Sequence, residues 1–144
     1  MKILFNEHPN KGFQRVGYCS YYGEIFYALE EVCEVTSSCG VPSRTSEFGS
    51  GYDAIVMGFG HTDCGDAGPM PTVNDNNIPL FPILNKEYTG LKQKLEWIKN
   101  MKPTAALTVH HDTEEYSKIT GVPFHRIMWS ANENLFKDLS LIHI

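Results

Sequence analysis

Short apolar runs alternate with amphipathic segments along this chain, and that alternation constrains its fold more than any other feature. Runs typical of buried strands occupy residues 2–6, 34–37, 52–58, 78–84, 104–110 and 124–129. Apolar residues repeat at helical spacing over 20–32 and 87–101, and a short helix is expected to begin at Asp112 and to end at Gly121. Strands that alternate with helices form a mainly parallel sheet, because right-handed crossovers place the helices on both of its faces. The sequence therefore predicts a doubly wound α/β domain.

Local sequence refines three of these elements. Pro79 and Pro82 favour an edge position for the fourth strand, because proline has no N–H to give to a neighbouring strand. The run from Asp112 to Glu115 has the spacing of a capping box, in which the aspartate side chain caps the helix that follows. Residues 60–77 are rich in Gly, Pro, Asp and Asn and lack periodicity, which predicts a long loop of the kind that is usually functional or mobile.

Charge and composition argue against several classes of protein. The 12 Lys and Arg residues are outnumbered by 17 Asp and Glu, for a net charge of -5, and no basic cluster occurs, so we expect no binding to nucleic acid or to anionic membranes. No apolar run approaches the roughly 20 residues of a membrane span. The first apolar run is too short for a secretory signal. The four cysteines show no CxxC spacing, which indicates reduced thiols and a cytoplasmic location.

The last six residues are not expected to be natural protein sequence. Residues 139–144 read Leu-Ser-Leu-Ile-His-Ile, which CTG TCT CTT ATA CAC ATC encodes, and that string is the transposon end attached to DNA fragments in shotgun sequencing. We therefore expect residues 139–144 to be translated adaptor and residues 1–138 to be one domain of a longer protein. The alternative is a genuine apolar terminal strand. Adaptor sequence is excluded from fold reasoning, so His143 carries no functional weight.

The loops that follow the strands are where a ligand is expected. In doubly wound sheets, ligands bind beyond the carboxyl ends of the strands. His110, His111 and Asp112 lie at such a place, between the strand 104–110 and the next helix. A histidine there could take a proton from a substrate hydroxyl, with a carboxylate holding its tautomer. The alternative is that Asp112 only caps the helix and the histidines pack or face water.

The loop after the first strand is a second candidate. Glu7 and His8 follow Asn6 at the end of that strand, and Gly12 and Gly17 come later in the loop. Glycines let backbone N–H groups approach a substrate or phosphate closely. The spacing is not the GxGxxG fingerprint of dinucleotide sites. Substrate contact and a plain surface turn both remain open for this loop.

The loop after the strand 52–58 is a third candidate. It begins at Gly60 and His61, which we also expect to contact substrate, and Asp63, Cys64 and Asp66 follow closely. His, Asp and Cys all bind zinc, and His110 or His111 would complete such a set. The spacing matches no standard structural zinc arrangement, so we assign no metal and treat this segment as a mobile loop.

A family resemblance emerges over the second half of the chain. Its motifs are Asn85-Lys86-Glu87-Tyr88 before an amphipathic helix, the strand end Thr108 to Asp112, Tyr116-Ser117-Lys118, Gly121 to Phe124, and Trp129 to Lys137. From Ile78 to Asp138 the chain resembles the amino-terminal half of GT-B glycosyltransferases, in particular the CgeB-like (spore-maturation-protein type) group. Asn132 stands where that group commonly has Asp. The first 77 residues match only the general architecture.

The resemblance implies a two-domain enzyme in which this Rossmann-like domain shapes the acceptor side. A nucleotide-sugar donor would bind mainly to the second domain, which is missing here, through a helix N-terminus and basic side chains. The resemblance implies no bound metal and no cofactor in this half. His110 or His111, with the loop from Glu7 to Gly12, would orient and partly deprotonate a hydroxyl-bearing acceptor. The fragment alone is expected to be inactive.

Two other classes of function remain open from the sequence. One is a stand-alone flavodoxin-like or receiver-like domain that recognises a small ligand or partner. Receiver domains need paired acidic residues after the first strand, and Asn6-Glu7 supplies only one. The other is a metal-dependent hydrolase that uses His61, His110 and His111.

Overall fold

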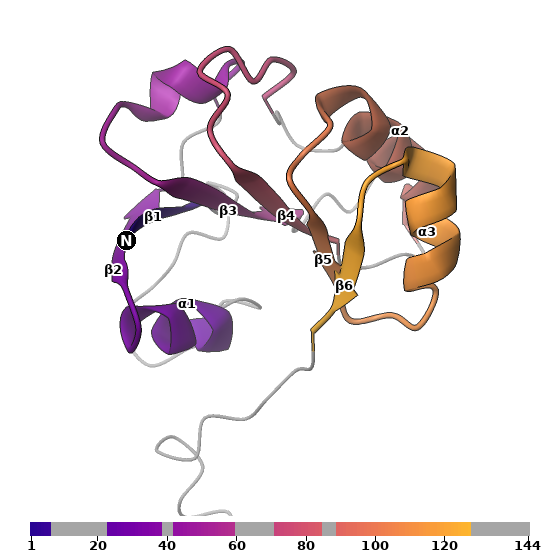
Figure 1. Ribbon diagram of the computed structural model, residues 1–144, viewed down its shortest axis with the longest axis horizontal. Helices are drawn as coiled ribbons and strands as arrows, with labels where there is room; N and C mark the ends of the chain where they lie inside the picture. Colours follow the sequence, from indigo (N-terminus) through magenta and orange to yellow (C-terminus); the bar gives the residue numbers. More distant parts are fainter. Residues whose placement is uncertain (7–22, 39–41, 60–70, 85–88, 128–144) are drawn as a thin grey trace, which may run out of the picture.

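A parallel sheet forms the centre of the molecule. The computed structural model describes residues 1–6, 23–38, 42–59, 71–84 and 89–127 (Figure 1). Six strands form one sheet in the order β2-β1-β3-β4-β5-β6, and every neighbouring pair is parallel. The strands are β1 (Lys2–Asn6), β2 (Glu34–Ser38), β3 (Ala54–Phe59), β4 (Leu80–Leu84), β5 (Ala106–Thr108) and β6 (Phe124–Arg126). From β1 the chain first builds outward to β2 and then turns back to build β3 to β6 on the other side, as the doubly wound prediction requires.

Helices cover both faces of this sheet. They are α1 (Gly23–Glu30), α2 (Leu91–Met101) and α3 (Thr113–Thr120), together with a short 3-10 helix, η2 (Thr45–Phe48). Alternate residues of each strand point to opposite faces. On one face, Phe5 and Val56 pack against Phe26 of α1. On the other, Leu84 packs with Ile98 of α2 and Tyr116 of α3. The predicted fold class is therefore confirmed, with α1 on one face and α2 and α3 on the other (Figure 1).

The amphipathic pattern overestimated the apolar face of α1. Phe26 is buried (1% exposed) and lies edge-on to the ring of Phe5, with ring centroids 5.6 Å apart. Val32, predicted to belong to the same apolar face, is 78% exposed. The helix ends at Glu30, and the chain then turns toward β2, with the Val32 N–H donating to the carbonyl of Leu29 (3.1 Å). Val32 therefore lies beyond the last helical residue, where helical spacing no longer applies.

The predicted edge position of the proline-containing strand was wrong. β4 lies inside the sheet, between β3 and β5, and Pro82 is buried. The carbonyl of Pro79 accepts a hydrogen bond from Ile55 of β3. Since successive residues of a strand direct their backbone groups to opposite neighbours, the nitrogen of Pro82 faces β5. The pairing of β4 with β5 begins only at Ile83, so the missing N–H falls outside that ladder.

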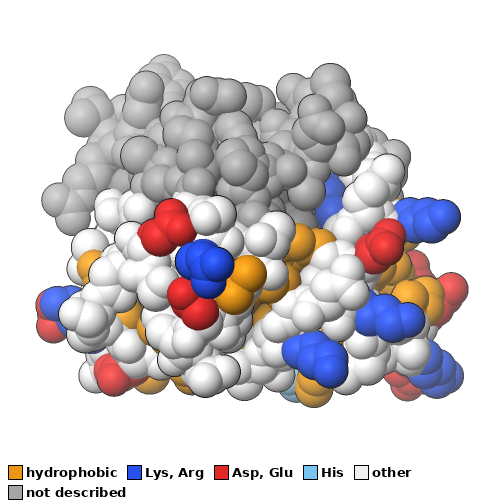
Figure 2. Space-filling view, turned by 90° about the horizontal axis from the view of Figure 1, so that it is seen from above, with side chains coloured by type: hydrophobic (Ala, Val, Ile, Leu, Met, Phe, Trp, Pro, Cys, Tyr) orange, Lys and Arg blue, Asp and Glu red, His pale blue; other side chains and the backbone are white. Residues whose placement is uncertain are grey.

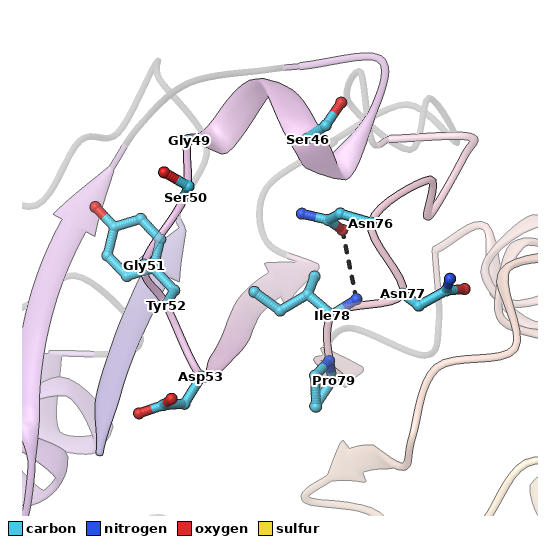
Figure 3. Close-up of a pocket in the computed structure, with 10 residues that line it drawn as sticks. All are labelled: Ser46, Gly49, Ser50, Gly51, Tyr52, Asp53, Asn76, Asn77, Ile78 and Pro79. Atoms are coloured by element: carbon cyan, nitrogen blue, oxygen red, sulfur yellow. Dashed lines mark hydrogen bonds between the residues drawn. The ribbon is translucent and has the colours of Figure 1, made fainter.

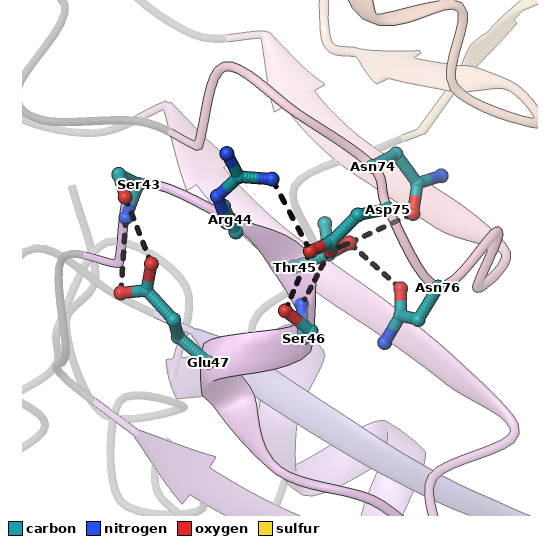
Figure 4. Close-up of polar contacts among 8 residues, drawn as sticks. All are labelled: Ser43, Arg44, Thr45, Ser46, Glu47, Asn74, Asp75 and Asn76. Carbon is teal, nitrogen blue, oxygen red and sulfur yellow. Dashed lines mark hydrogen bonds and ion pairs between the residues drawn. The ribbon is translucent and has the colours of Figure 1, made fainter.

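The connection that enters β3 lies beside the connection that enters β4. The first of these connections contains η2, and a parallel bridge joins Arg44 to Val73. A group of polar residues, which we call the Thr45 cluster, lies at this junction: Thr45, Ser46, Asn74, Asp75 and Asn76 (Figure 4). The Thr45 side chain is fully buried, and its hydroxyl lies 2.7 Å from Oδ1 of Asn76 and 2.9 Å from Oδ1 of Asn74. These contacts fix residues 74–76 although no helix or strand contains them.

The remaining elements match their predictions in kind; β1 has the predicted bounds, β2 is one residue longer, and the others are shorter. β5 covers three residues rather than seven, and α2 begins four residues later than expected. The longest helix among the described residues, α2, has 11 residues, and none of the helices seen there combines the length and the hydropathy that a bilayer crossing needs. The predicted adaptor at 139–144, the end of the 124–129 run, and residues 60–70 of the predicted loop lie outside the described residues.

Candidate functional site

The carboxyl ends of the strands define one edge of the sheet, which we call the carboxyl edge. Because the chain leaves β1 toward β2 on one side and continues from β3 on the other, the strand order changes direction between β1 and β3. Ligands in such folds bind at this point, beyond the strand ends. Asn6 is the last residue of β1 and is nearly buried (6% exposed), and its register partner on β3 is Met57. A polar side chain therefore stands at the place where a ligand is expected.

The predicted histidines lie on the same edge, at the turn from β5 to α3. His110 is half-buried and its N–H donates to the hydroxyl of Thr108 (3.1 Å), which is itself fully buried. His111 and Asp112 are exposed. Neighbouring parallel strands lie about 4.8 Å apart, so with β4 between them the ends of β3 and β5 are about 10 Å apart. The distance from the histidine turn to the ends of β1 and β3 is therefore about the width of a small ligand.

Asp112 does not act as the predicted cap. It occupies the N-cap position of α3, and its backbone carbonyl accepts the first helical hydrogen bond, from Tyr116 (3.0 Å). Its side chain, however, makes no capping hydrogen bond. The backbone of Asp112 (φ -83°, ψ 31°) is not in the extended conformation that directs a capping side chain back over the helix. The capping-box prediction was therefore right about where the helix begins and wrong about the role of the carboxylate.

The other predicted site residues lie outside the described residues. These are Glu7, His8, Gly12, Gly17, Gly60 and His61. In the sequence they follow β1 and β3, the two neighbouring strands at which the order changes direction. Their roles stay predictions.

A lysine that the sequence reasoning missed is buried near this edge. Lys94 lies in the first turn of α2, which begins at the carboxyl edge, and it is only 3% exposed. Burying an ammonium group is costly unless it is paired or hydrogen-bonded, so a buried lysine at this position is unusual. The signal was present in the sequence, because Lys94 is spaced three residues after Leu91 and four before Ile98, on the apolar face of the helix.

Electrostatics at the α3 N-terminus disfavour an anionic ligand. A helix N-terminus normally attracts phosphate through its free N–H groups. Here Asp112 occupies the N-cap, and Glu114 and Glu115 lie in the first turn. Three carboxylates repel a pyrophosphate but not a neutral hydroxyl group. The β5 to α3 turn is therefore better suited to an uncharged substrate.

Most of the residues in the metal interpretation lie outside the part of the chain that the structure describes. Across the residues that the structure describes, no group of three or more His, Cys, Asp and Glu side chains lies close enough together to hold a metal ion. His61, Asp63, Cys64 and Asp66 fall outside that part.

Comparisons with known proteins returned nothing: no family, no curated protein and no solved structure matches the chain. Its function must therefore be argued from the fold and the residues themselves.

Proposed function

We propose that this chain is the acceptor-side domain of a glycosyltransferase that moves a sugar from a nucleotide-sugar donor to a hydroxyl-bearing acceptor. The observation that carries the proposal is the β5 to α3 turn at the carboxyl edge. It presents His110, His111 and Asp112 on the edge of the sheet where the strand order changes direction, about 10 Å from the end of β3. The resemblance of residues 78–138 to CgeB-like GT-B enzymes agrees with it.

The charge of the turn supports an acceptor rather than a donor site. A nucleotide sugar carries a pyrophosphate, which needs cations or free N–H groups. The turn offers carboxylates instead, at Asp112, Glu114 and Glu115. A sugar hydroxyl is neutral and must lose a proton as it attacks, which a histidine near a carboxylate assists. In this proposal His111 takes that proton, because its side chain is exposed at the edge.

The proposal assigns the donor to a second domain outside residues 1–138. The test is to express the gene with its reading frame extended past residue 138 and to assay release of nucleoside diphosphate from a panel of nucleotide sugars. We expect a second α/β domain and transferase activity. His111→Ala should lower kcat by about 10²–10⁴-fold, the usual contribution of a general base.

A matched control is available on the neighbouring strand. His125 is an exposed histidine in the middle of β6 rather than at the turn. His125→Ala should leave kcat within about twofold of the wild type. An extended frame without a second domain, or equal losses in the two variants, would overturn the proposal.

A second candidate is a stand-alone flavodoxin-like ligand-binding domain. The specific observation in its favour is the order β2-β1-β3-β4-β5, which is the flavodoxin-like order with β6 added. Flavins in such folds bind between β1 and β3. Titration of FMN with the purified chain separates the two candidates, since quenching of flavin fluorescence with one equivalent bound favours the second.

We place the protein in the cytoplasm. Cys33, the cysteine that the described residues include, is a free thiol whose Sγ donates to the carbonyl of Leu29 (3.0 Å). A free thiol fits a reducing compartment.

A further inference from the structure

A pocket of about 640 Å³ lies at the opposite end of the sheet from the candidate site (Figure 3). Its walls are the segment that enters β3 and the segment that enters β4. The lining residues are Ser46, Gly49, Ser50, Gly51, Tyr52, Asp53, Asn76, Asn77, Ile78 and Pro79. Its volume falls within the range of about 300–1,000 Å³ that is typical of small-molecule sites. The predicted loop 60–77 includes the lining residues Asn76 and Asn77, but the sequence assigned no ligand-binding residue to this end of the sheet.

An aromatic ring and an amide stand on opposite sides of this pocket. The half-buried ring of Tyr52 forms one wall, and Lys2, which does not line the pocket, holds it from outside with Nζ 5.5 Å from the ring centroid. On the other side, Oδ1 of Asn76 accepts from the Thr45 hydroxyl (2.7 Å) and the Ile78 N–H (3.4 Å). The amide nitrogen of Asn76 is thereby turned toward the segment 49–52 across the pocket (Figure 3).

Two glycines lie on the same wall of the pocket as Tyr52, in the segment that enters β3. Gly49 and Gly51 have φ angles of 94° and 89°, a conformation that residues with a side chain rarely adopt. A Cβ at either position would meet nothing within 4 Å, so the space above both is empty. A ligand can therefore approach the backbone of residues 50 and 51, whereas the Gly49 N–H already donates to the carbonyl of Ser46 (3.1 Å).

The charge of the lining excludes anions as preferred ligands. Asp53 is the sole charged residue among the ten lining residues. Its Oδ2 accepts a hydrogen bond from the Lys2 N–H (2.6 Å), which fixes the carboxylate in place. Asp75, next to the lining residue Asn76 in the sequence, is paired with Arg44 (Nη1 to Oδ2, 3.7 Å), so Asp53 supplies the charge that a ligand meets. In the view from above, Lys and Arg side chains of the described residues are mixed with Asp and Glu rather than gathered into one basic patch (Figure 2).

We propose that this pocket binds a neutral polyhydroxylated ligand, a mono- or disaccharide. The C–H groups of a sugar ring pack against the negative face of an aromatic ring, which Tyr52 supplies. Its hydroxyls require neutral donors and acceptors, which the Asn76 amide, Ser50 and the open backbone supply. This site is separate from the carboxyl edge, and the inference stands without the proposed transferase function.

The test is a titration followed by amide NMR on the isotope-labelled chain. The probes are methyl β-glucopyranoside and methyl α-mannopyranoside, with glucose 1-phosphate as the charged counterpart and adenine as a flat probe without a sugar. At least one glycoside should shift the amides of Ser50 to Asp53 and of Asn76 to Ile78. Glucose 1-phosphate should bind there at least tenfold more weakly, because it brings an anion to an acidic pocket.

Two tryptophan variants decide whether the pocket itself binds. Ser50→Trp fills the pocket and should abolish these shifts. Thr104→Trp places the same side chain on an exposed residue at the same end of the sheet and should leave them unchanged. If Ser50→Trp fails to fold, Tyr52→Leu replaces it and should weaken binding at least tenfold. The proposal is overturned if neither glycoside shifts these amides, if adenine or glucose 1-phosphate binds there more tightly, or if the pocket variants bind as the wild type does.

Discussion

Asp75 receives two hydrogen bonds from Ser46, one from the hydroxyl (2.7 Å) and one from the backbone N–H (3.0 Å). Ser46 belongs to η2, which precedes β3, and Asp75 belongs to the connection that precedes β4. One carboxylate therefore joins two segments that are 29 residues apart in the sequence. The hydroxyl bond first, and the backbone bond next, hold the pKa of Asp75 below its usual 3.8.

This lowered pKa predicts a loss of stability in acid. Because the pKa of Asp75 is lower in the folded chain than in the unfolded chain, the ionised carboxylate favours folding above the unfolded value. That contribution disappears as the pH falls through the folded value. The urea midpoint should therefore decline below about pH 5, and the decline should be shallower in Asp75→Asn and in Ser46→Ala. Acid slopes equal to that of the wild type in both variants would contradict this account.

The buried hydroxyl of Thr45 makes a second prediction. A hydroxyl has one proton, so it donates to one of the surrounding oxygens of Asn74 and Asn76 at a time and holds both in place. Thr45→Val keeps the shape and removes the hydrogen bond, although Asn76 Oδ1 keeps the Ile78 N–H as a donor, and should cost about 0.5–1.5 kcal/mol in the free energy of unfolding. Thr104→Val is the control, because Thr104 is exposed, and should cost less than about 0.5 kcal/mol. Equal losses in urea unfolding would show that the Thr45 hydroxyl has no special role.

Phe26 and Val32 give a third prediction, since the amphipathic pattern put both on one apolar face. Phe26 is 1% exposed and is the buried anchor of α1 on the sheet, whereas Val32 is 78% exposed. Phe26→Ala should therefore lower the free energy of unfolding by about 3–5 kcal/mol. Val32→Ala should change it by less than about 0.5 kcal/mol. Chemical unfolding measures both, and a large loss in Val32→Ala would mean that this residue is covered in solution.

The sequence predicted the sheet well because burial on both faces leaves a plain signal. β1 and β3 are continuous apolar runs, and residues such as Leu4 and Ile55 pack on one face while Phe5 packs on the other. Which strands lie next to each other in the sheet leaves a weaker signal in the sequence. Pro82 suggested an edge, but the direction of its nitrogen and the late start of β5 pairing allow it inside the sheet. Residue type alone does not encode that direction.

The candidate site was predictable only in part. Its position followed from strand ends, so the turn holding His110 and His111 was found. The pocket beside Tyr52 was missed because it depends on pairing between distant segments: Thr45 meets Asn76 across 31 residues. The roles of individual side chains were harder still to predict. Asp112 occupies the N-cap position of α3, but its carboxylate makes no capping hydrogen bond.

The ends of α2 and α3 allow a last test of backbone strain. Lys102 and Gly121 both end a helix in the left-handed conformation, with φ of 48° and 73°, and both N–H groups donate to the carbonyl four residues earlier. That conformation costs a residue with a Cβ about 1–2 kcal/mol, and glycine gives back about 0.4–1 kcal/mol through the entropy of the unfolded chain. Lys102→Gly should therefore raise the free energy of unfolding by about 0.5–1 kcal/mol, and Gly121→Ala should lower it by a similar amount. A Cβ at Gly121 would meet nothing within 4 Å, so crowding cannot produce that loss. Urea unfolding of the two variants should move in opposite directions, and movement in the same direction would show that strain at Lys102 does not limit stability.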